Sequence, residues 1–398
     1  MFTIVRTPSI LKSIVSKERY YNLDGLRGIA ALTVVAFHFF SAYVPGLLSE
    51  QTPTPWWGSD TPLAVLYNGG FAVSVFFVLS GFVLSNSAAR RQSPLWFNLA
   101  QRYFRLAIPV LGGTLLSFTL LSLYPHTVSE LKAAGDHPWL QWVYDGQIPN
   151  FPWAVRDALF GVFKTGRSFF DNVLWTMRIE LLGSIGIYLL YGTVHERLRT
   201  PLLIAALCFY VIFLKRPEYA AFAVGALMRE ARIHYPFPPV LVWPSLAFTI
   251  IFGAMMQGYA ARNGLPQWPR MLSLGEPHQL WHVAAAAAAV YATLLLPSLK
   301  RSFGSRPGRF LGDVSFSLYL VHVPLLYTVF VPAFIRMRGE TFGMVTLFVA
   351  FLACSLIVAY AFTVLVDRPT IALIHRAQRA VKATWPMSGI TKADSERR

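Results

Sequence analysis

Long apolar runs alternate with short polar or basic segments along most of the chain. Most of these runs are close to the ~20 residues that an α-helix needs to cross about 30 Å of hydrocarbon. Their apolar residues are continuous and do not follow the two-residue alternation of a membrane β-barrel strand. The pattern therefore predicts an all-α, polytopic transmembrane helix bundle. We expect ten helices, at residues 24–44, 66–87, 103–124, 172–192, 201–214, 217–229, 238–260, 279–299, 310–335 and 343–366.

The segment 201–229 has two interpretations. Lys215, Arg216 and Pro217 interrupt it and leave two pieces that are shorter than a comfortable span. If it were one broken helix, the chain would cross nine times and every later segment would change sides. With ten crossings and a cytosolic N-terminus, the cytosolic segments carry 23 Lys and Arg residues and the opposite segments carry 10. This asymmetry favours ten helices with both termini cytosolic.

Composition agrees with a membrane protein and argues against other classes. The 398 residues are 55% hydrophobic and only 14% charged, and the mean hydropathy is +0.48. Soluble domains carry about 25% charged residues. A net charge of +16 could indicate nucleic-acid binding, but basic cytosolic loops explain it, so no nucleic-acid partner is expected. Cys208 and Cys354 lie in apolar runs and are expected to be packed thiols and not a disulfide.

The predicted domain organisation is a single membrane domain with two short flanks. Residues 1–22 lack the apolar core and cleavage site of a signal peptide, and they predict a cytosolic amphipathic segment. Residues 23–370 form the membrane domain, and 371–398 predict a basic cytosolic tail that begins with an amphipathic helix at the membrane interface. The longest loop, 125–171, is rich in aromatic residues. It is either an aromatic belt at the headgroups or a lid over a binding pocket.

Arg27 and His38 are the most informative polar residues inside an apolar run. They are eleven residues apart, so on a helix both side chains share one face, roughly 16 Å apart along the axis. Buried ionisable groups are costly in hydrocarbon and usually face a cavity or a partner helix. We therefore expect one polar chamber that holds both, with Asp24 paired to Arg27. Gly25 and Gly28 would allow another helix to approach this one closely.

Two other polar groups lie at the edge of or inside apolar runs. Arg102 and Arg105 share a helical face just cytosolic of a predicted span, where they suit either a phosphate-rich nucleotide or ordinary membrane anchoring. Glu180 lies within an apolar run, where an isolated carboxylate is costly. It could orient His38, pair with Arg27, or form an ion pair that holds helices together.

Ser315, Tyr319 and His322 share one face of the helix predicted at 310–335, and Pro324 is expected to kink that helix around a cavity. His322 could bind substrate or hydrogen-bond to a neighbouring helix. No second histidine or cysteine is clustered with it, so no metal site is expected.

Six short motifs, in order across roughly residues 20–370, resemble the hallmarks of the acyltransferase-3 family of membrane O-acyltransferases. The motifs are LDGLRGIAALTVVAFH in the first predicted helix, VSVFFVLSGFVLS with Ser80, RYFRLAIP with Arg102 and Arg105, LWTMRIELL from Trp175 to Glu180, LGDVSFSLYLVH ending at His322, and Asp367-Arg368-Pro369. The second of these, VSVFFVLSGFVLS, is most similar to fungal members of the family.

The resemblance implies an enzyme that moves an acyl group, expected to be acetyl, from acyl-coenzyme A to a hydroxyl of a small molecule, glycan or lipid. Arg27, Arg102 and Arg105 would bind the donor. His38 would act as general base or carry the acyl group transiently, and Glu180 would organise the polar centre. Acyl-CoA is then a substrate, and no permanently bound cofactor is expected. The residues expected to line the acceptor pocket are Asp24, Ser80, Trp175, Ser315, Tyr319 and His322.

The sequence departs from the family pattern at three positions. Ser74 stands where many members carry an acidic residue, Arg178 replaces a small residue, and Asp313 stands where a basic residue is frequent. No hydrolase-like domain follows the membrane portion, so the acceptor is expected to reach the bundle itself.

A multipass transporter is the alternative function. Buried Arg, His and Glu residues could relay protons or bind an anion, although no internal repeat or pair of broken helices is visible. The expected location is the endoplasmic reticulum or a later secretory membrane if the source is eukaryotic, with no retention signal at the C-terminus.

Overall fold

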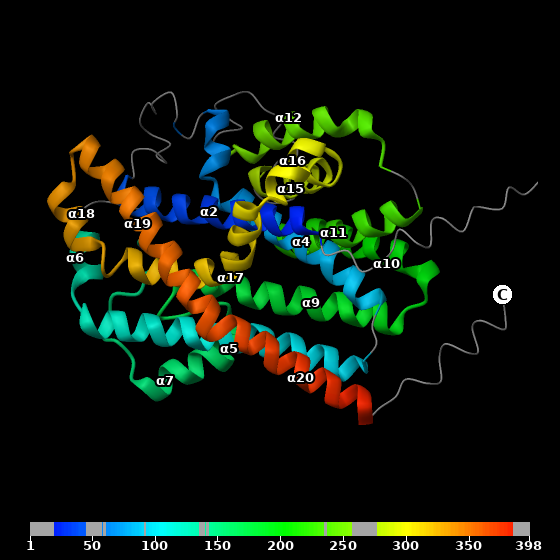
Figure 1. Ribbon diagram of the computed structural model, residues 1–398, viewed down its shortest axis with the longest axis horizontal. Coiled ribbons are helices and arrows are strands. Elements are labelled where there is room, and N and C mark those ends of the chain that lie inside the picture. The colour runs from blue at the N-terminus through cyan, green and yellow to red at the C-terminus, as the bar shows by residue number, and fades with distance from the viewer. Residues whose placement is uncertain are drawn as a thin grey trace, which may run out of the picture.

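Helices make up the regular secondary structure of the residues that the structure describes. The computed structural model describes residues 20–44, 58, 61–90, 93–134, 140, 143–234, 237–256 and 277–384, and within these ranges it has no β-strand (Figure 1). The residues before 20 and after 384, which hold most of the two predicted flanks, lie outside this part. The helices are α2 (Tyr21–Tyr43), η1 (Pro62–Leu66), α4 (Gly69–Ala89), α5 (Leu95–Leu123), α6 (Thr127–Ala134), α7 (Phe151–Arg156), η3 (Asp157–Gly161), α8 (Val162–Thr165), η4 (Asn172–Leu174), α9 (Trp175–Thr193), α10 (Glu196–Cys208), η5 (Phe209–Phe213), α11 (Pro217–His234), η6 (Pro239–Leu241), α12 (Val242–Gly253), α15 (Pro277–Leu295), α16 (Pro297–Phe303), α17 (Arg306–Leu326), α18 (Val331–Met337), α19 (Thr341–Phe362), η7 (Thr363–Asp367) and α20 (Arg368–Thr384).

Five helices of the described chain are long and apolar enough to cross a membrane, and two bent helix pairs raise the number to seven. The five are Tyr21–Tyr43, Gly69–Ala89, Leu95–Leu123, Asn172–Thr193 and Thr341–Thr384. The bent pairs are Gln279–Leu295 with Pro297–Phe303, at 92°, and Arg306–Leu326 with Val331–Met337, at 59°. Each of the ten predicted segments contains helix, but α10, α11 and α12 do not meet the length and hydropathy that a span needs. The prediction of ten spans is therefore met only in part.

The first helix and the late helix α17 run parallel and close together. An added Cβ at Gly28 would lie 2.6 Å from the main chain of Leu311, and one at Gly312 would lie 2.5 Å from the Asp24 carbonyl oxygen. Further along, Tyr43 donates a hydrogen bond to the Leu326 carbonyl. The close approach predicted at this glycine-containing face is thus confirmed. We call the two ends of the bundle the Asp24 end and the Tyr43 end.

The ambiguous segment 201–229 is a helical hairpin and not one broken helix. Helix α10 continues into η5, the chain turns at Lys215 with a φ of 52°, and α11 returns alongside. The rings of Tyr210 and Tyr219 stack across the turn, with centroids 5.4 Å apart. Helix α10 with η5 and helix α11 therefore run through the bundle in opposite directions. A single helix in their place would have reversed the direction of every later helix, and α17 would then run antiparallel to α2.

The described residues of the long loop 125–171 include several short helices. Helix α6 is followed by α7, η3 and α8, which join into one helical stretch that returns along α5. Phe151 lies against Phe118, and the Tyr103 hydroxyl donates to the Leu159 carbonyl at 2.5 Å. The loop therefore folds back toward the Asp24 end before α9 begins.

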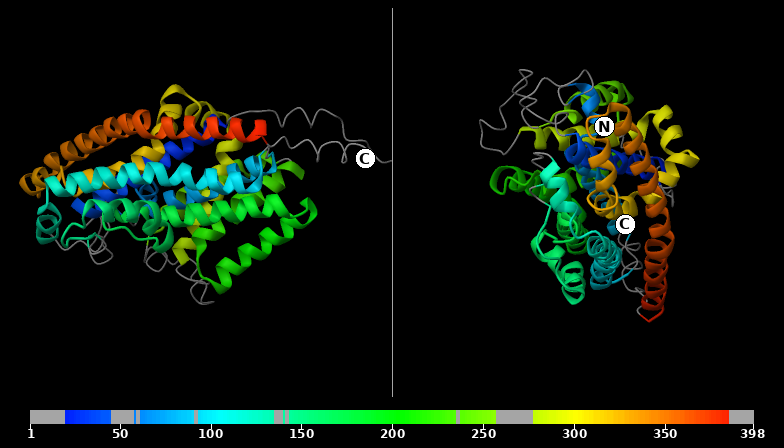
Figure 2. Two further views of the ribbon diagram at one scale, coloured as in Figure 1. Left: turned by 90° about the horizontal axis from the view of Figure 1, so that it is seen from below. Right: turned by 90° about the vertical axis from the view of Figure 1, so that its left-hand side faces the viewer.

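Helices α19, η7 and α20 form one continuous helical rod (Figure 2). Its 44 residues would measure about 66 Å at 1.5 Å per residue, which is longer than a bilayer is thick. A π-helical turn, η7, precedes Pro369 and accommodates its missing N–H, so the helix continues where the sequence predicts an end. The expected amphipathic helix is present, but it extends α19 and packs on the start of α5, as in the contact of Gln378 with Ser93 at 3.5 Å.

Candidate active site

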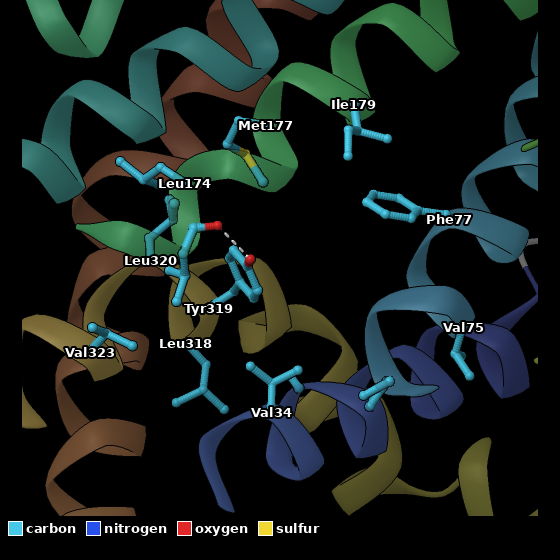
Figure 3. Packing of buried hydrophobic residues seen from close by; sticks show 14 of the residues in the cluster. Val34, Val75, Phe77, Leu174, Met177, Ile179, Leu318, Tyr319, Leu320 and Val323 are labelled. Atoms are coloured by element: carbon cyan, nitrogen blue, oxygen red, sulfur yellow. Dashed lines mark hydrogen bonds between the residues drawn. The ribbon is translucent and has the colours of Figure 1, made fainter. Parts of the chain in front are cut away.

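Two cavities lie within the bundle on opposite sides of a thin wall. The larger has a volume of about 910 Å³, contains His38, and lies between α2, α4, α15 and the chain before α9. The smaller, about 320 Å³, contains Arg27 and lies between α2, α4, α5 and α9. Val73 and Tyr319 line both cavities and so form the wall. Figure 3 shows Tyr319 among the apolar core side chains, and its hydroxyl donates to the Val173 carbonyl at 2.7 Å.

His38 and His322 form a hydrogen-bonded pair between α2 and α17. His38 Nδ1 lies 2.9 Å from His322 Nε2, and His322 Nδ1 lies 2.8 Å from the Leu318 carbonyl oxygen. A carbonyl can only accept, so His322 Nδ1 carries the proton and its Nε2 accepts. His38 must then donate from Nδ1, which leaves Nε2 as the unprotonated nitrogen of a neutral ring. Of the two open readings of His322, the hydrogen bond to a neighbouring helix is the one that the structure contains.

Glu180 pairs with Arg102 at the edge of the smaller cavity. The guanidinium binds the Glu180 carboxylate directly and also donates from Nε to Ser184 at 2.8 Å. Ser80 donates to the same carboxylate at 2.8 Å. Helix α9 lies beside α5, so the carboxylate binds Arg102 directly, and it also interacts electrostatically with Arg27, which lines the same cavity. Of the three sequence-based interpretations of Glu180, an ion pair between helices is the one with a direct contact.

The other two arginines of the smaller cavity also have carboxylate partners. Arg105 binds Asp367 through two hydrogen bonds, at 2.5 and 3.2 Å, which tie α5 to η7. Arg27 pairs with Asp24 at 3.4 Å, as predicted. All three guanidiniums are therefore held in place before any ligand binds, and a phosphate would have to share them with these carboxylates.

Arg27 and His38 do not share one chamber, and that expectation is wrong. They lie on the same face of α2, but about three turns separate them. Val34 and the wall residue Tyr319 occupy the interval, so the guanidinium faces one cavity and the imidazole faces the other.

The remaining predicted pocket residues divide between the cavities. Trp175 lines the larger cavity, as does Ser74, one of the departures from the family pattern. Residues 143–145 and 166–169 also line it, so the loop 125–171 covers this cavity. Ser315 lines neither cavity, because its hydroxyl donates to Gly312 of its own helix at 2.8 Å. Among the described residues, no three His, Cys, Asp or Glu side chains gather as metal ligands would.

Comparison with known proteins identifies the family to which the chain belongs. A model of the acyltransferase-3 family, described as an acyltransferase domain, matches residues 20–364. The chain belongs to this family. It is 25% identical to the O-acetyltransferase PaAT-1 of Phomopsis amygdali, over 77% of this chain and 72% of the relative. It is 27% identical to the acyltransferase MdmB of Streptomyces mycarofaciens, over 76% of this chain and 78% of the relative. No solved structure matches significantly.

This acyltransferase-3 protein is therefore a multi-pass membrane enzyme that transfers acyl groups other than aminoacyl groups.

Sequence reasoning missed two polar residues near its larger cavity, Asn68 and His282. Asn68 accepts from the Phe71 main-chain N–H and caps α4, which an asparagine directly before an apolar run can indicate. His282 is an isolated histidine within an apolar helix, the same signal that marks His38.

Proposed function

We propose that this acyltransferase-3 protein is an O-acyltransferase that moves an acyl group, acetyl in the first instance, from acyl-CoA to a hydroxyl. The acceptor is a small molecule, a glycan or a lipid that enters the larger cavity. The observation that carries the proposal is the His38–His322 pair, since its hydrogen bonds leave a basic nitrogen on His38 in a ring that lines this cavity.

In the proposed reaction, His38 Nε2 takes the proton of the acceptor hydroxyl as its oxygen attacks the thioester carbonyl carbon. The carbon–sulfur bond breaks, and the proton passes from the imidazolium to the CoA thiolate, so the products are the ester and free CoA. His322 stabilises the imidazolium by accepting from Nδ1. A second route, in which Nε2 attacks the thioester and carries the acyl group before the alcohol takes it, uses the same geometry.

The donor is proposed to bind on the smaller-cavity side. Arg27, Arg102 and Arg105 place three guanidiniums there, and a guanidinium pairs well with phosphate. Each would share its hydrogen bonds between its present carboxylate and a phosphate of CoA. The thioester would then reach the hydroxyl across the wall at Val73 and Tyr319.

We further propose ten membrane crossings, with both termini cytosolic and a membrane domain at residues 23–370. The parallel course of α2 and α17 requires an odd number of traverses between them, and the hairpin of α10 and α11 supplies two of the seven in the ten-helix prediction. The positive-inside rule then puts the Asp24 end in the cytosol, where acyl-CoA is available. In a eukaryotic cell we expect the endoplasmic reticulum or a later secretory membrane.

The test is turnover by protein purified in lipid nanodiscs. Acetyl-CoA labelled on the acetyl group is incubated with fractionated alcohols from the source cells, and both free CoA and labelled ester are measured. His38→Ala should lower ester formation by at least about a hundredfold, the usual contribution of a general base. Arg105→Gln should raise the KM for the donor, with Arg105→Lys intermediate and the exposed Arg376→Gln unchanged.

Wild-type turnover by His38→Ala would refute the assigned base. If labelled ester never forms but a solute crosses sealed vesicles in a His38-dependent way, the transporter alternative replaces the proposal. Gel filtration of each variant separates loss of chemistry from loss of folding.

A further inference from the structure

One carboxylate in the larger cavity lacks a partner. Glu218, the second residue of α11, lines this cavity. Its Oε2 is buried and has no hydrogen-bond partner, and Glu218 forms no ion pair with any residue that the structure describes. A buried carboxylate oxygen without a partner costs free energy. Both oxygens share the negative charge, so a cation in the cavity that reaches either of them would lower this cost.

The other charged side chains of the lining are paired or exposed. Lys132 and Asp145 form an ion pair at 2.9 Å, and Lys132 also donates to the Val143 carbonyl at 2.7 Å. Arg167 is exposed, so its charge needs no partner inside the cavity. Among the charged residues that the structure places in this lining, Glu218 is therefore the one whose charge is partly buried and uncompensated.

Two arginines act on the same part of α11 without pairing with Glu218. Arg178 and Arg216 interact electrostatically with Tyr219, the next residue of the helix, as Glu218 itself does. Both arginines are exposed, and neither lines the cavity. Because solvent and ions screen exposed charges, these arginines compensate a carboxylate in the cavity only weakly.

Most uncharged polar groups of the lining bind other parts of the protein. Ser74 and Ser168 donate hydrogen bonds, at 3.0 and 2.8 Å, and His282 lies 2.9 Å from Asn68. Asn172 differs, because its Oδ1 is buried without a partner, as Glu218 Oε2 is. An amide can present either its oxygen or its nitrogen, so the preference for a positive charge rests on Glu218.

One small molecule can reach both Glu218 and His38. Helix α2, which carries His38, and α11, which carries Glu218, both pack on α4. Packed helices lie about 8–10 Å apart, so the axes of α2 and α11 are at most about 20 Å from each other. The cavity that both side chains line has a volume of about 910 Å³, which suits a compact small molecule.

We infer that the acceptor is an amino alcohol whose hydroxyl reacts at His38 while its protonated amine, in another part of the molecule, pairs with Glu218. This inference rests on the proposed function in taking the larger cavity as the acceptor's site. Glu218 is thus a specificity-determining residue. It selects cationic acceptors over neutral ones and orients the reacting hydroxyl toward His38.

A purely structural role of Glu218 leads to different expectations. The helix dipole favours a carboxylate in the first turn of a helix, and Glu218 lies there in α11. In that role, Glu218→Gln lowers Tm but changes the binding of cationic and neutral ligands equally. In the inferred role, Gln keeps the size and loses the preference for the amine, whereas Glu218→Asp keeps the charge and part of the preference.

The probes are tritiated steroids with one hydroxyl and a tertiary amine at different distances from it, each with a neutral analogue in which CH replaces the nitrogen. Binding to protein in zwitterionic nanodiscs is measured at pH 7 by equilibrium dialysis without acyl-CoA, and empty nanodiscs correct for partition into lipid. Wild type should bind the best amine at least about tenfold more tightly than its analogue, or about 1.4 kcal/mol. Glu218→Gln should reduce this ratio to below about threefold, with little change for the analogue.

Two matched variants control for charge. Glu196→Gln removes the same charge from an exposed residue of α10 outside the cavity, and it should keep the preference. Asp145→Asn removes the other carboxylate of the lining and should keep most of the preference. An equal loss in Asp145→Asn would overturn the assignment to Glu218, because the amine would then respond to the net charge of the cavity.

Equal affinities in wild type, or an unchanged preference in a folded Glu218→Gln protein, would also overturn the inference. Absence of saturable binding of every amine would overturn the acceptor class. The assay contains no donor, so its outcome is independent of catalysis. Selective amine binding without His38-dependent turnover would support this inference and refute the proposed reaction, whereas His38-dependent turnover of neutral alcohols alone would do the reverse.

Discussion

Replacing His322 tests whether the histidine pair sets the catalytic state of His38. His322 is fully buried and lines neither cavity. It can therefore influence the acceptor only through its hydrogen bond with His38. In His322→Leu the bulk is largely kept, but the acceptor that His322 Nε2 offers to His38 Nδ1 is lost. In His322→Gln the side-chain oxygen can replace Nε2 as the acceptor.

The expected size of the effect follows from one hydrogen bond. In the proposed reaction His38 takes a proton in the transition state, and its bond to His322 at 2.9 Å would then become charge-assisted. Such bonds contribute about 1.5–3 kcal/mol, and each 1.36 kcal/mol changes a rate tenfold. His322→Leu should therefore lower kcat by about 10- to 150-fold. This loss is smaller than that of His38→Ala, because the base itself remains.

Single-turnover and steady-state rates with labelled acetyl-CoA measure this prediction. The KM for the donor should change little, since the smaller cavity is untouched, and His322→Gln should recover most of kcat. The reasoning is refuted if His322→Leu is folded and fully active, or if Gln and Leu are equally impaired. Either result would mean that the hydrogen bond from His38 Nδ1 does not matter for the reaction.

Three further predictions concern the wall, the ion pair and the covering loop. Val73→Trp should fill the passage between the cavities, so that kcat falls while the KM for the donor is kept. Glu180→Ala should leave the Arg102 guanidinium without its carboxylate and lower stability by about 3 kcal/mol, visible as a lower Tm, and a double substitution of both residues by Met should restore part of it. Burial raises the pKa of the Asp157 carboxyl, against a hydrogen bond from Ser168 that lowers it. The folded state then binds more protons than the unfolded one, so Tm should fall as pH rises from the ordinary carboxyl pKa through the raised one, and Asp157→Asn should flatten that slope.

Sequence patterns locate the polar groups on helix faces but not their partners. The stripe from Arg27 to His38, the pair of arginines near 102 and the glycines that admit α17 all follow from helical periodicity. The partners do not, because they come from remote parts of the chain: 284 residues separate His38 from His322, and 262 separate Arg105 from Asp367. Periodicity gives the direction in which a side chain points, and only helix packing decides what it meets. The prediction of ten crossings rests on a different kind of signal, a charge asymmetry that is summed over all loops.

The division of Arg27 and His38 between two cavities limits how this enzyme can work. A guanidinium about three helical turns from the base cannot touch the reacting carbonyl while the imidazole does. That separation is close to what an extended donor needs, with phosphates at the arginines and the thioester further along the helix. The distance between Arg27 and His38 therefore favours a donor that enters at the Asp24 end and meets the acceptor at the wall between the two cavities. Val73 and Tyr319 line both cavities, so in the proposed reaction thioester and alcohol would meet beside them, and substitutions of these two side chains should change the rate more than substitution of any single arginine.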